Sequence, residues 1–153
     1  MPIVRSPCPI VRWVRRVTVT TQISASADRV WRALTVPSEV QRWDGVIPSD
    51  VAENYPTAGQ DARWSTKAGP LRLTLHDRIR VVDPPRRFAS SISVGFVHVE
   101  EEYRLQSCGH GSELVSANEV RSSIPGLGWL ALRLTKSNVE MSMERLKAFC
   151  EQQ

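Results

Sequence analysis

Apolar and polar positions follow two different periods along the chain, and the change comes near residue 125. Before that point apolar residues alternate with polar ones, most clearly in residues 71–82 and 97–106, as in strands with one buried face. Residues 125–150 follow the helical period instead. One apolar stripe, within about 40° on a helical wheel, contains Leu132, Val139, Met143, Leu146 and Cys150. A second group, on nearly the opposite side, contains Leu127, Leu130, Leu134 and Met141. We therefore expect this helix to meet apolar surroundings over most of its circumference.

The remaining elements follow from local signals. Residues 16–25 alternate as a first strand, and Ser26 is placed to cap a short helix. Pro37 ends that helix and starts a second one, which reaches Trp43. The other expected strands are 51–54, 62–66, 71–82, 88–94, 97–106 and 112–122. Because tight turns join these strands, they should pair antiparallel. The order predicts an α+β fold in which a curved antiparallel sheet of about seven strands wraps on the long terminal helix.

Length and charge give broad limits. The 153 residues suit a single domain over residues 16–153, with residues 1–15 as an N-terminal tail or strand extension. The net charge of +4 is mild, and its arginines near the start accompany neither a recognition helix nor a stacking motif, so we expect no nucleic-acid binding. No segment approaches membrane-spanning length and no secretory signal is apparent, which predicts a cytoplasmic protein without stable membrane insertion. The sequence is also compatible with a homodimer.

Sequence motifs point away from several chemistries. Cys8, Cys108 and Cys150 are widely separated, which predicts free thiols and neither a disulfide framework nor a zinc site. His76 and Asp77 are adjacent on one expected strand, so they point to opposite faces and form no simple dyad. The sequence has no metal-binding histidine spacing, no Gly-rich phosphate loop and no nucleophile elbow. We therefore expect no metal and no cofactor.

The order of elements resembles the START/Bet v 1-like (SRPBCC) superfamily, the helix-grip fold that includes polyketide cyclases and lipid-transport proteins. The resemblance covers residues 17–150 and rests on the segment 23–34 followed by Pro37 and Trp43, on the turn 82–88, and on the terminal helix. Ser26 stands where many relatives have proline, which affects only the helix cap. The resemblance implies a helix-grip fold and a polyketide-like or lipid-like ligand, and it carries over no universal catalytic residue.

Three polar residues on inward strand faces are the candidates for catalysis. Asp77 has apolar neighbours two residues away on its strand, and Glu101 and Tyr103 lie on the inward face of the strand 97–106. A carboxyl in apolar surroundings has a raised pKa and can serve as a general acid or base. The alternative is that each carboxyl pairs with an arginine, or that a bulge turns it outward.

The expected ligand-binding residues are mostly apolar or aromatic, with Asn118 able to orient a carbonyl or hydroxyl group. They are Trp43, Trp64, Leu75, Ile92, Phe96, Val99, Asn118, Trp129, Leu130 and Leu134. The tryptophans are equally compatible with ordinary core positions, and Asn118 with a buried hydrogen bond to the backbone.

The main functional prediction is that the protein binds a small hydrophobic or aromatic molecule between the sheet and the terminal helix. One alternative is an enzyme of the aromatase or cyclase type that moves a proton with Asp77, Glu101 or Tyr103. Another is an interaction module with a filled interior. A continuous pocket of roughly 300 Å³ or more would favour the first two.

Overall fold

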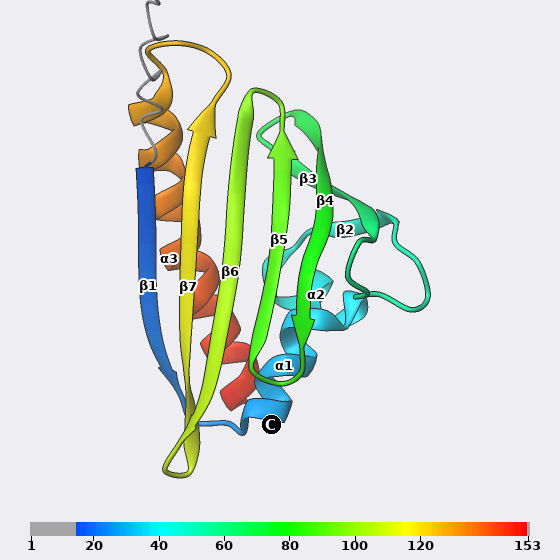
Figure 1. Ribbon diagram of the computed structural model, residues 1–153, viewed down its shortest axis with the longest axis vertical. Helices are drawn as coiled ribbons and strands as arrows, with labels where there is room; N and C mark the ends of the chain where they lie inside the picture. Colours follow the sequence, from blue (N-terminus) through cyan, green and yellow to red (C-terminus); the bar gives the residue numbers. More distant parts are fainter. Residues whose placement is uncertain (1–14, 153) are drawn as a thin grey trace, which may run out of the picture.

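The computed structural model describes residues 15–152, in which one antiparallel sheet of seven strands lies against three helices (Figure 1). The strand order is β1-β7-β6-β5-β4-β3-β2. The strands are β1 (Arg15–Ile23), β2 (Ile47–Asp50), β3 (Asp61–Ala68), β4 (Leu71–Asp83), β5 (Arg87–Val94), β6 (Val97–Cys108) and β7 (Gly111–Ser122). The helices are α1 (Ala27–Thr35), α2 (Pro37–Asp44) and α3 (Gly128–Glu151). The predicted helix-grip α+β fold is confirmed, while residues 1–14 of the expected N-terminal tail lie outside the described range.

The three helices share one face of the sheet. The long helix α3 packs on β1 and β7 at one side, and α2 contacts α3 and the edge strand β2 (Figure 1). Consecutive strands from β2 to β7 pair in hairpin order, and β1 joins β7, so the first and last strands are neighbours. The third helix, α1, contacts β6 and β7, whereas β4 and β5 have no extensive contact with any helix.

The two short helices begin and end where local signals place them. The Ser26 hydroxyl accepts a hydrogen bond from the backbone N–H of Arg29 at 3.2 Å, which caps α1. Pro37 occupies the first turn of α2, where its missing N–H costs nothing. Gly45 ends α2 with a φ of +81°, a conformation that glycine adopts without strain.

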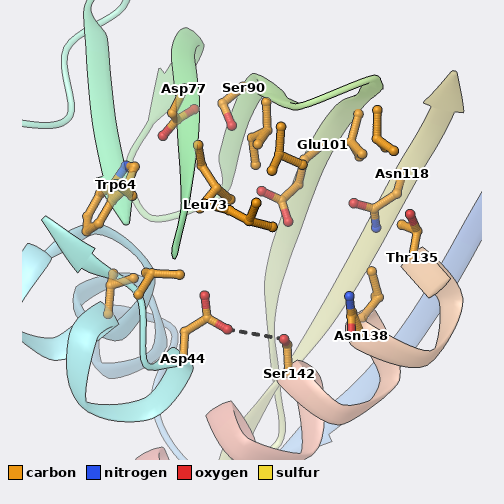
Figure 2. Close-up of a pocket in the computed structure, with 18 of the residues that line it drawn as sticks. Asp44, Trp64, Leu73, Asp77, Ser90, Glu101, Asn118, Thr135, Asn138 and Ser142 are labelled. Atoms are coloured by element: carbon orange, nitrogen blue, oxygen red, sulfur yellow. Dashed lines mark hydrogen bonds between the residues drawn. The ribbon is translucent and has the colours of Figure 1, made fainter. Parts of the chain in front are cut away.

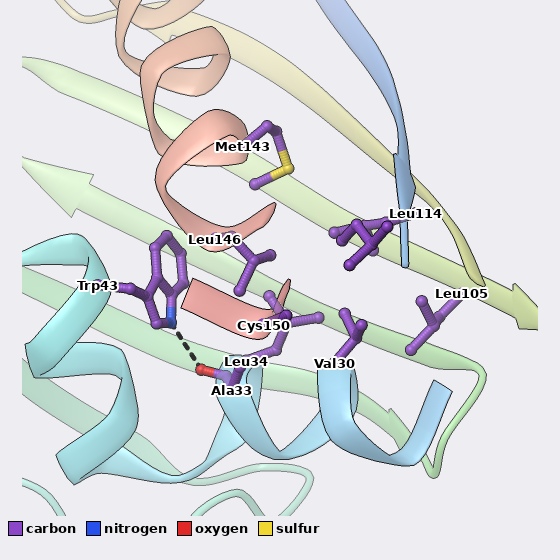
Figure 3. Close-up of a cluster of buried hydrophobic side chains, with 10 residues drawn as sticks. Val30, Ala33, Leu34, Trp43, Leu105, Leu114, Met143, Leu146 and Cys150 are labelled. Carbon is purple, nitrogen blue, oxygen red and sulfur yellow. Dashed lines mark hydrogen bonds between the residues drawn. The ribbon is translucent and has the colours of Figure 1, made fainter. Parts of the chain in front are cut away.

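The hydrophobic core fills the end of the molecule where α1, α2 and the last turns of α3 meet (Figure 3). The Trp43 indole N–H donates to the carbonyl of Ala33 at 2.8 Å, so the ring is buried with its polar atom satisfied. The core consists of Ile23, Val30, Ala33, Leu34, Trp43, Leu105, Leu114, Met143, Leu146 and Cys150. The two described cysteines are free thiols, Cys150 in this core and Cys108 at the surface; Cys8 lies outside the described residues.

Two expectations about elements were wrong. The expected strand at 51–54 is a loop, and the short edge strand is Ile47–Asp50, which tolerates Pro48 because an edge strand has unpaired N–H positions. The terminal helix is less buried than expected, because Leu134 and Met141 are 56% and 49% exposed. The sheet covers only one side of this helix, so only the stripe around Met143 and Leu146 meets the core. No described helix combines the length and apolar composition needed to span a membrane.

Candidate functional site

A cavity of about 630 Å³ lies between the inner face of the sheet and α3 (Figure 2). Its volume falls within the usual range of small-molecule sites and is larger than the roughly 300 Å³ that separates a pocket from a filled interior. The interior is therefore hollow at this end of the molecule, which argues against the interaction module with a filled interior.

Strands β3 to β7 supply one wall of the cavity, and α3 supplies the other. The helix residues recur at helical spacing, so a single face of α3 covers the hollow. These residues are Ala131, Leu134, Thr135, Asn138, Val139, Ser142 and Met143.

Most of the predicted site residues lie together around this cavity. All three catalytic candidates, Asp77, Glu101 and Tyr103, line it. The ligand-binding candidates that line it are Trp43, Trp64, Leu75, Ile92, Phe96, Val99, Asn118 and Leu134. Trp129 and Leu130 are not among the lining residues, because the face of α3 over the cavity begins at Ala131 and Trp129 is 55% exposed.

Glu101 and Tyr103 form a close pair on β6. They are two residues apart on one strand, so both side chains point inward. The Tyr103 hydroxyl donates to Glu101 Oε1 at 2.6 Å. Burial raises the pKa of Glu101 to about 7; the hydrogen bond from Tyr103 opposes this rise, and the nearby carboxyls of Asp77 and Asp44 add to it. Glu101 can therefore exchange a proton at neutral pH.

Asp77 forms a second polar group on β4, and it is only 7% exposed. The Tyr55 hydroxyl, from the loop after β2, donates to Asp77 Oδ2 at 3.3 Å. Burial raises the pKa of Asp77, and the nearby polar groups of Ser90, Trp64 and Tyr55 oppose the rise; of these three, only Tyr55 has the geometry of a hydrogen bond to this carboxyl. The buried Asp77 Oδ1 and the buried Ser90 hydroxyl make no hydrogen bond with residues 15–152.

The sequence left open that Asp77 and Glu101 each pair with an arginine. Within residues 15–152, neither carboxyl does so. The only side-chain hydrogen bonds in this part of the chain to Asp77 and Glu101 come from Tyr55 and Tyr103. The strand arginines point outward, where Arg80 pairs with Glu100 at 3.0 Å. Asn118 donates to the Ser116 hydroxyl at 3.0 Å, a side-chain partner in place of the expected backbone one.

Several lining residues with polar groups have no counterpart in the sequence predictions. Asp44, the last residue of α2, accepts a hydrogen bond from the Ser142 hydroxyl of α3 at 3.2 Å (Figure 2). Burial raises the pKa of Asp44, and Ser142 and Arg145 oppose the rise. Leu134, Asn138 and Ser142 follow one another at intervals of about one helical turn, so they lie on one face of α3. Because Leu134 was predicted to line the cavity, this spacing could have indicated the other two. Asp44 lies at the end of a helix and Tyr55 lies in a loop, so no repeating pattern in the sequence indicates where their side chains point.

No set of three or more His, Cys, Asp or Glu side chains within residues 15–152 is arranged to hold a metal ion.

Comparison with known proteins identifies both a family and a fold. The sequence model of the family described as polyketide cyclase / dehydrase and lipid transport matches residues 14–151. No curated protein matches the chain. Protein CV1439 from Chromobacterium violaceum has 16% identity and a TM-score of 0.75, over 90% of this chain and 98% of that one.

Two further solved structures have the same fold. DynU16, a protein in the dynemicin biosynthetic locus, has 21% identity and a TM-score of 0.72, over 90% of this chain and 47% of its own. Ara h 8.0201 has 11% identity and a TM-score of 0.75, over 90% of this chain and 97% of its own. At these identities the structural likeness shows the fold alone.

Proposed function

The chain belongs to the polyketide cyclase / dehydrase and lipid transport family, and on this premise we propose that it binds a small hydrophobic or aromatic molecule in the cavity under α3. The observation that carries the proposal is the cavity itself, about 630 Å³ of space enclosed by the sheet and the helix. A volume of this size accommodates a molecule of drug-like dimensions.

The lining has the composition of a site for an apolar ligand. Aromatic and aliphatic side chains form most of the wall, and polar side chains such as Asp77, Glu101 and Asn118 form the remainder. Phe96 and Leu134 line the cavity and are also 40% and 56% exposed, so they mark its opening to solvent. A ligand can therefore reach the interior between the β5–β6 turn and the start of α3.

The family supports a ligand of polyketide-like or lipid-like character, since its description names both polyketide cyclases and lipid transport. DynU16, whose fold this chain shares, is described as a protein of a biosynthetic locus. Location in the cytoplasm and assembly as a homodimer stay predictions from the sequence.

Binding is tested with Nile red, a neutral dye whose fluorescence rises in apolar surroundings. The folded protein should take up the dye, and native mass spectrometry of the purified protein should detect any small molecule that it retains. Val99→Trp fills the cavity and should abolish dye uptake, while Val115→Trp, on the opposite face of the sheet, should leave it unchanged. Equal dye uptake by the two variants, or none by the native protein, would remove the basis of the proposal.

A second candidate function is an aromatase- or cyclase-type enzyme, and the Glu101–Tyr103 pair favours it. An ionised Glu101 can remove a proton from a carbon between two carbonyl groups of a bound poly-β-ketone. That carbon then attacks a distant carbonyl carbon, a carbon–carbon bond forms, and Glu101 returns its proton to the new alkoxide oxygen. The step balances without a co-reactant, and Tyr103 keeps Glu101 oriented through the 2.6 Å hydrogen bond.

The catalytic candidate is tested with a poly-β-ketone thioester, by comparing the ring-closed products formed with and without protein. Native protein should change the product ratio from that of spontaneous closure. Glu101→Gln should return the ratio to the spontaneous one while Nile red still binds. Identical ratios for native protein and Glu101→Gln would leave the protein as a binder without this activity.

A further inference from the structure

The charged groups around the cavity all have the same sign. Asp44, Asp77 and Glu101 line it, and no Lys, Arg or His is found among the lining residues of the described chain. The two carboxyls Asp77 and Asp44 both act electrostatically on Glu101. A hollow with an apolar wall therefore has acidic groups that no lining cation from residues 15–152 balances.

Three of the polar groups form one patch on the inner face of adjacent strands. Ser90 of β5 is paired directly with Glu101 of β6, and Asp77 of β4 is paired with Ile92, two residues from Ser90. The close-up shows Asp77, Ser90 and Glu101 in sequence along the sheet above the hollow (Figure 2). Asp77 and Ser90 are only 7% and 1% exposed, yet Asp77 Oδ1 and Ser90 Oγ have no hydrogen-bond partner in the described residues.

Aromatic rings surround this patch. Tyr55 packs edge to face against Trp64 with ring centroids 5.6 Å apart, and Tyr103 stacks on Phe88 at 6.4 Å. All four residues line the cavity. The hydroxyl groups of Tyr55 and Tyr103 already donate to the two carboxyls, so Asp77 Oδ1 is left as an acceptor without a donor in the described residues, and the Ser90 hydroxyl is free both to accept and to donate.

We propose that the ligand is a hydrophobic amine whose protonated nitrogen binds between Asp77, Ser90 and Glu101, with its apolar body in the rest of the cavity. This inference rests on the proposed function, because it specifies the class of molecule that the same cavity takes.

The chemistry of the patch distinguishes among the possible ligand head groups. An ammonium group has three N–H donors and no acceptor, which suits the unpartnered Asp77 Oδ1 and Ser90 Oγ. Hydrogen bonds between an ammonium and a carboxylate are about twice as strong as neutral ones. The neighbouring aromatic faces also attract a cation. A carboxylate head group would instead add a negative charge to a hollow for which the described residues supply no lining cation, and an alcohol offers a single donor.

Binding of a cation should be linked to release of a proton from Glu101. Within residues 15–152, the groups around Glu101 are Tyr103 on its own strand, Ser90 on β5, Asn118 on β7, Asp77 on β4 and Asp44 on α2. Tyr55 adjoins Asp77, and Arg145 acts on Asp44. Because burial raises the pKa of Glu101 to about 7, part of the protein holds this proton at neutral pH. A bound ammonium favours the ionised carboxyl, so amine affinity should rise between pH 6 and pH 8.

The proposal is tested by displacing Nile red with decylamine, decanol and decanoate, three probes that share one alkyl chain. At pH 8 decylamine should bind about tenfold or more tightly than decanol, as expected for a charge-assisted hydrogen bond. Decanoate should bind most weakly. Between pH 6 and pH 8 the affinity for decylamine should rise, and the affinity for decanol should stay nearly constant.

Two variants locate the effect. Asp77→Asn and Glu101→Gln should each reduce the preference for decylamine over decanol severalfold, with decanol affinity retained. Glu140→Gln, on the exposed side of α3, is the matched control and should preserve the full preference. The comparison of the three probes uses the native chain, so it stands even if one variant does not fold.

Three other results of the displacement experiment would overturn the amine proposal, its location or the proposed function. Equal affinities for decylamine and decanol, or tighter binding of decanoate, would overturn the amine proposal and leave the hydrophobic cavity in place. A preference that survives both carboxyl variants would overturn the assignment to this patch. Failure of the native protein to take up Nile red or any of the three probes would overturn the proposed function itself.

Discussion

Neighbouring glutamates on the two faces of the sheet have pKa values shifted in opposite directions. On the outer face Glu100 and Glu102 lie among arginines, whereas Glu101, between them in sequence, points into the cavity and has a tyrosine as its partner. Burial alone would raise the pKa of Glu100, but hydrogen bonds from Ser91 and His98, with the charge of Arg80, lower it overall. For Glu101 burial dominates and the pKa rises to about 7.

The outer and inner faces of the sheet therefore give their carboxyls different electrostatic surroundings. On the outer face Glu100 and Glu102 each pair with an arginine, and the pKa of each carboxyl is lowered. The inner face is apolar and is hollow at the cavity end, where the described residues place acidic groups without a lining cation. Groups kept in such an unfavourable state are typical of functional sites. The arrangement fits a chain in which one end of the interior provides stability and the other end receives a ligand.

The largest effect should come from the filled end of the inner face. Leu146 is fully buried in the core, so Leu146→Ala should lower the free energy of unfolding by roughly 2 to 5 kcal/mol. Lys147→Ala changes the adjacent, partly exposed position, whose ion pair with Glu151 lies at the surface, and should leave the urea midpoint near that of the native protein. Equal shifts of the two midpoints would show that α3 is rotated differently.

A smaller and pH-dependent effect is expected from Glu101→Gln. The folded pKa of about 7 lies above the ordinary value of 4.5, so folding favours the protonated carboxyl. The native protein should therefore lose stability as pH rises from about 4.5 through 7, and the amide variant should not. At pH 8 the variant should be more stable by roughly 1 to 3 kcal/mol. Parallel stability profiles of the two proteins would contradict the account.

The same substitution on the outer face should have the opposite sign and the smallest effect. Glu100 has a lowered pKa, so its ionised form contributes stability above the ordinary value and loses it as pH falls. Glu100→Gln should reduce stability at pH 7 by less than about 1 kcal/mol, because the ion pair with Arg80 is partly exposed and screened by salt. The measurement is urea unfolding at low and high salt, and a stabilised Glu100→Gln variant would remove the difference between the faces.

Strand periodicity was sufficient to predict the inward carboxyls. Asp77 and Glu101 alternate with apolar residues, and a strand places every second side chain on one face, so both lie on the cavity wall as the sequence indicates. The same rule placed Leu75 and Val99 there. The fold class followed from the order of elements, because hairpin connections and a terminal helix leave few alternatives.

Contacts between elements far apart in sequence leave no periodic signal along the chain. Asp44 reaches the cavity only because α2 is docked against Ser142 of α3, and Tyr55 only because its loop folds over β4. Trp129 was misplaced because the direction of a residue near a helix start depends on where the helix begins, and α3 begins at Gly128. The apolar pattern of α3 is the same whether the helix covers a packed core or a hollow. It therefore did not reveal that part of α3 faces the cavity, with Leu134 at the opening.

The most direct test of the inward, uncompensated carboxyl is a titration of the three consecutive glutamates by carbon-13 NMR of their side-chain carboxyls. Glu101 should titrate near pH 7, and Glu100 and Glu102 should both titrate below the ordinary value of 4.5. Added decylamine should lower the midpoint of Glu101 and leave the other two unchanged. If Glu101 titrates together with its two neighbours, the inner face does not hold an acidic group in an apolar cavity, and the account is wrong at its centre.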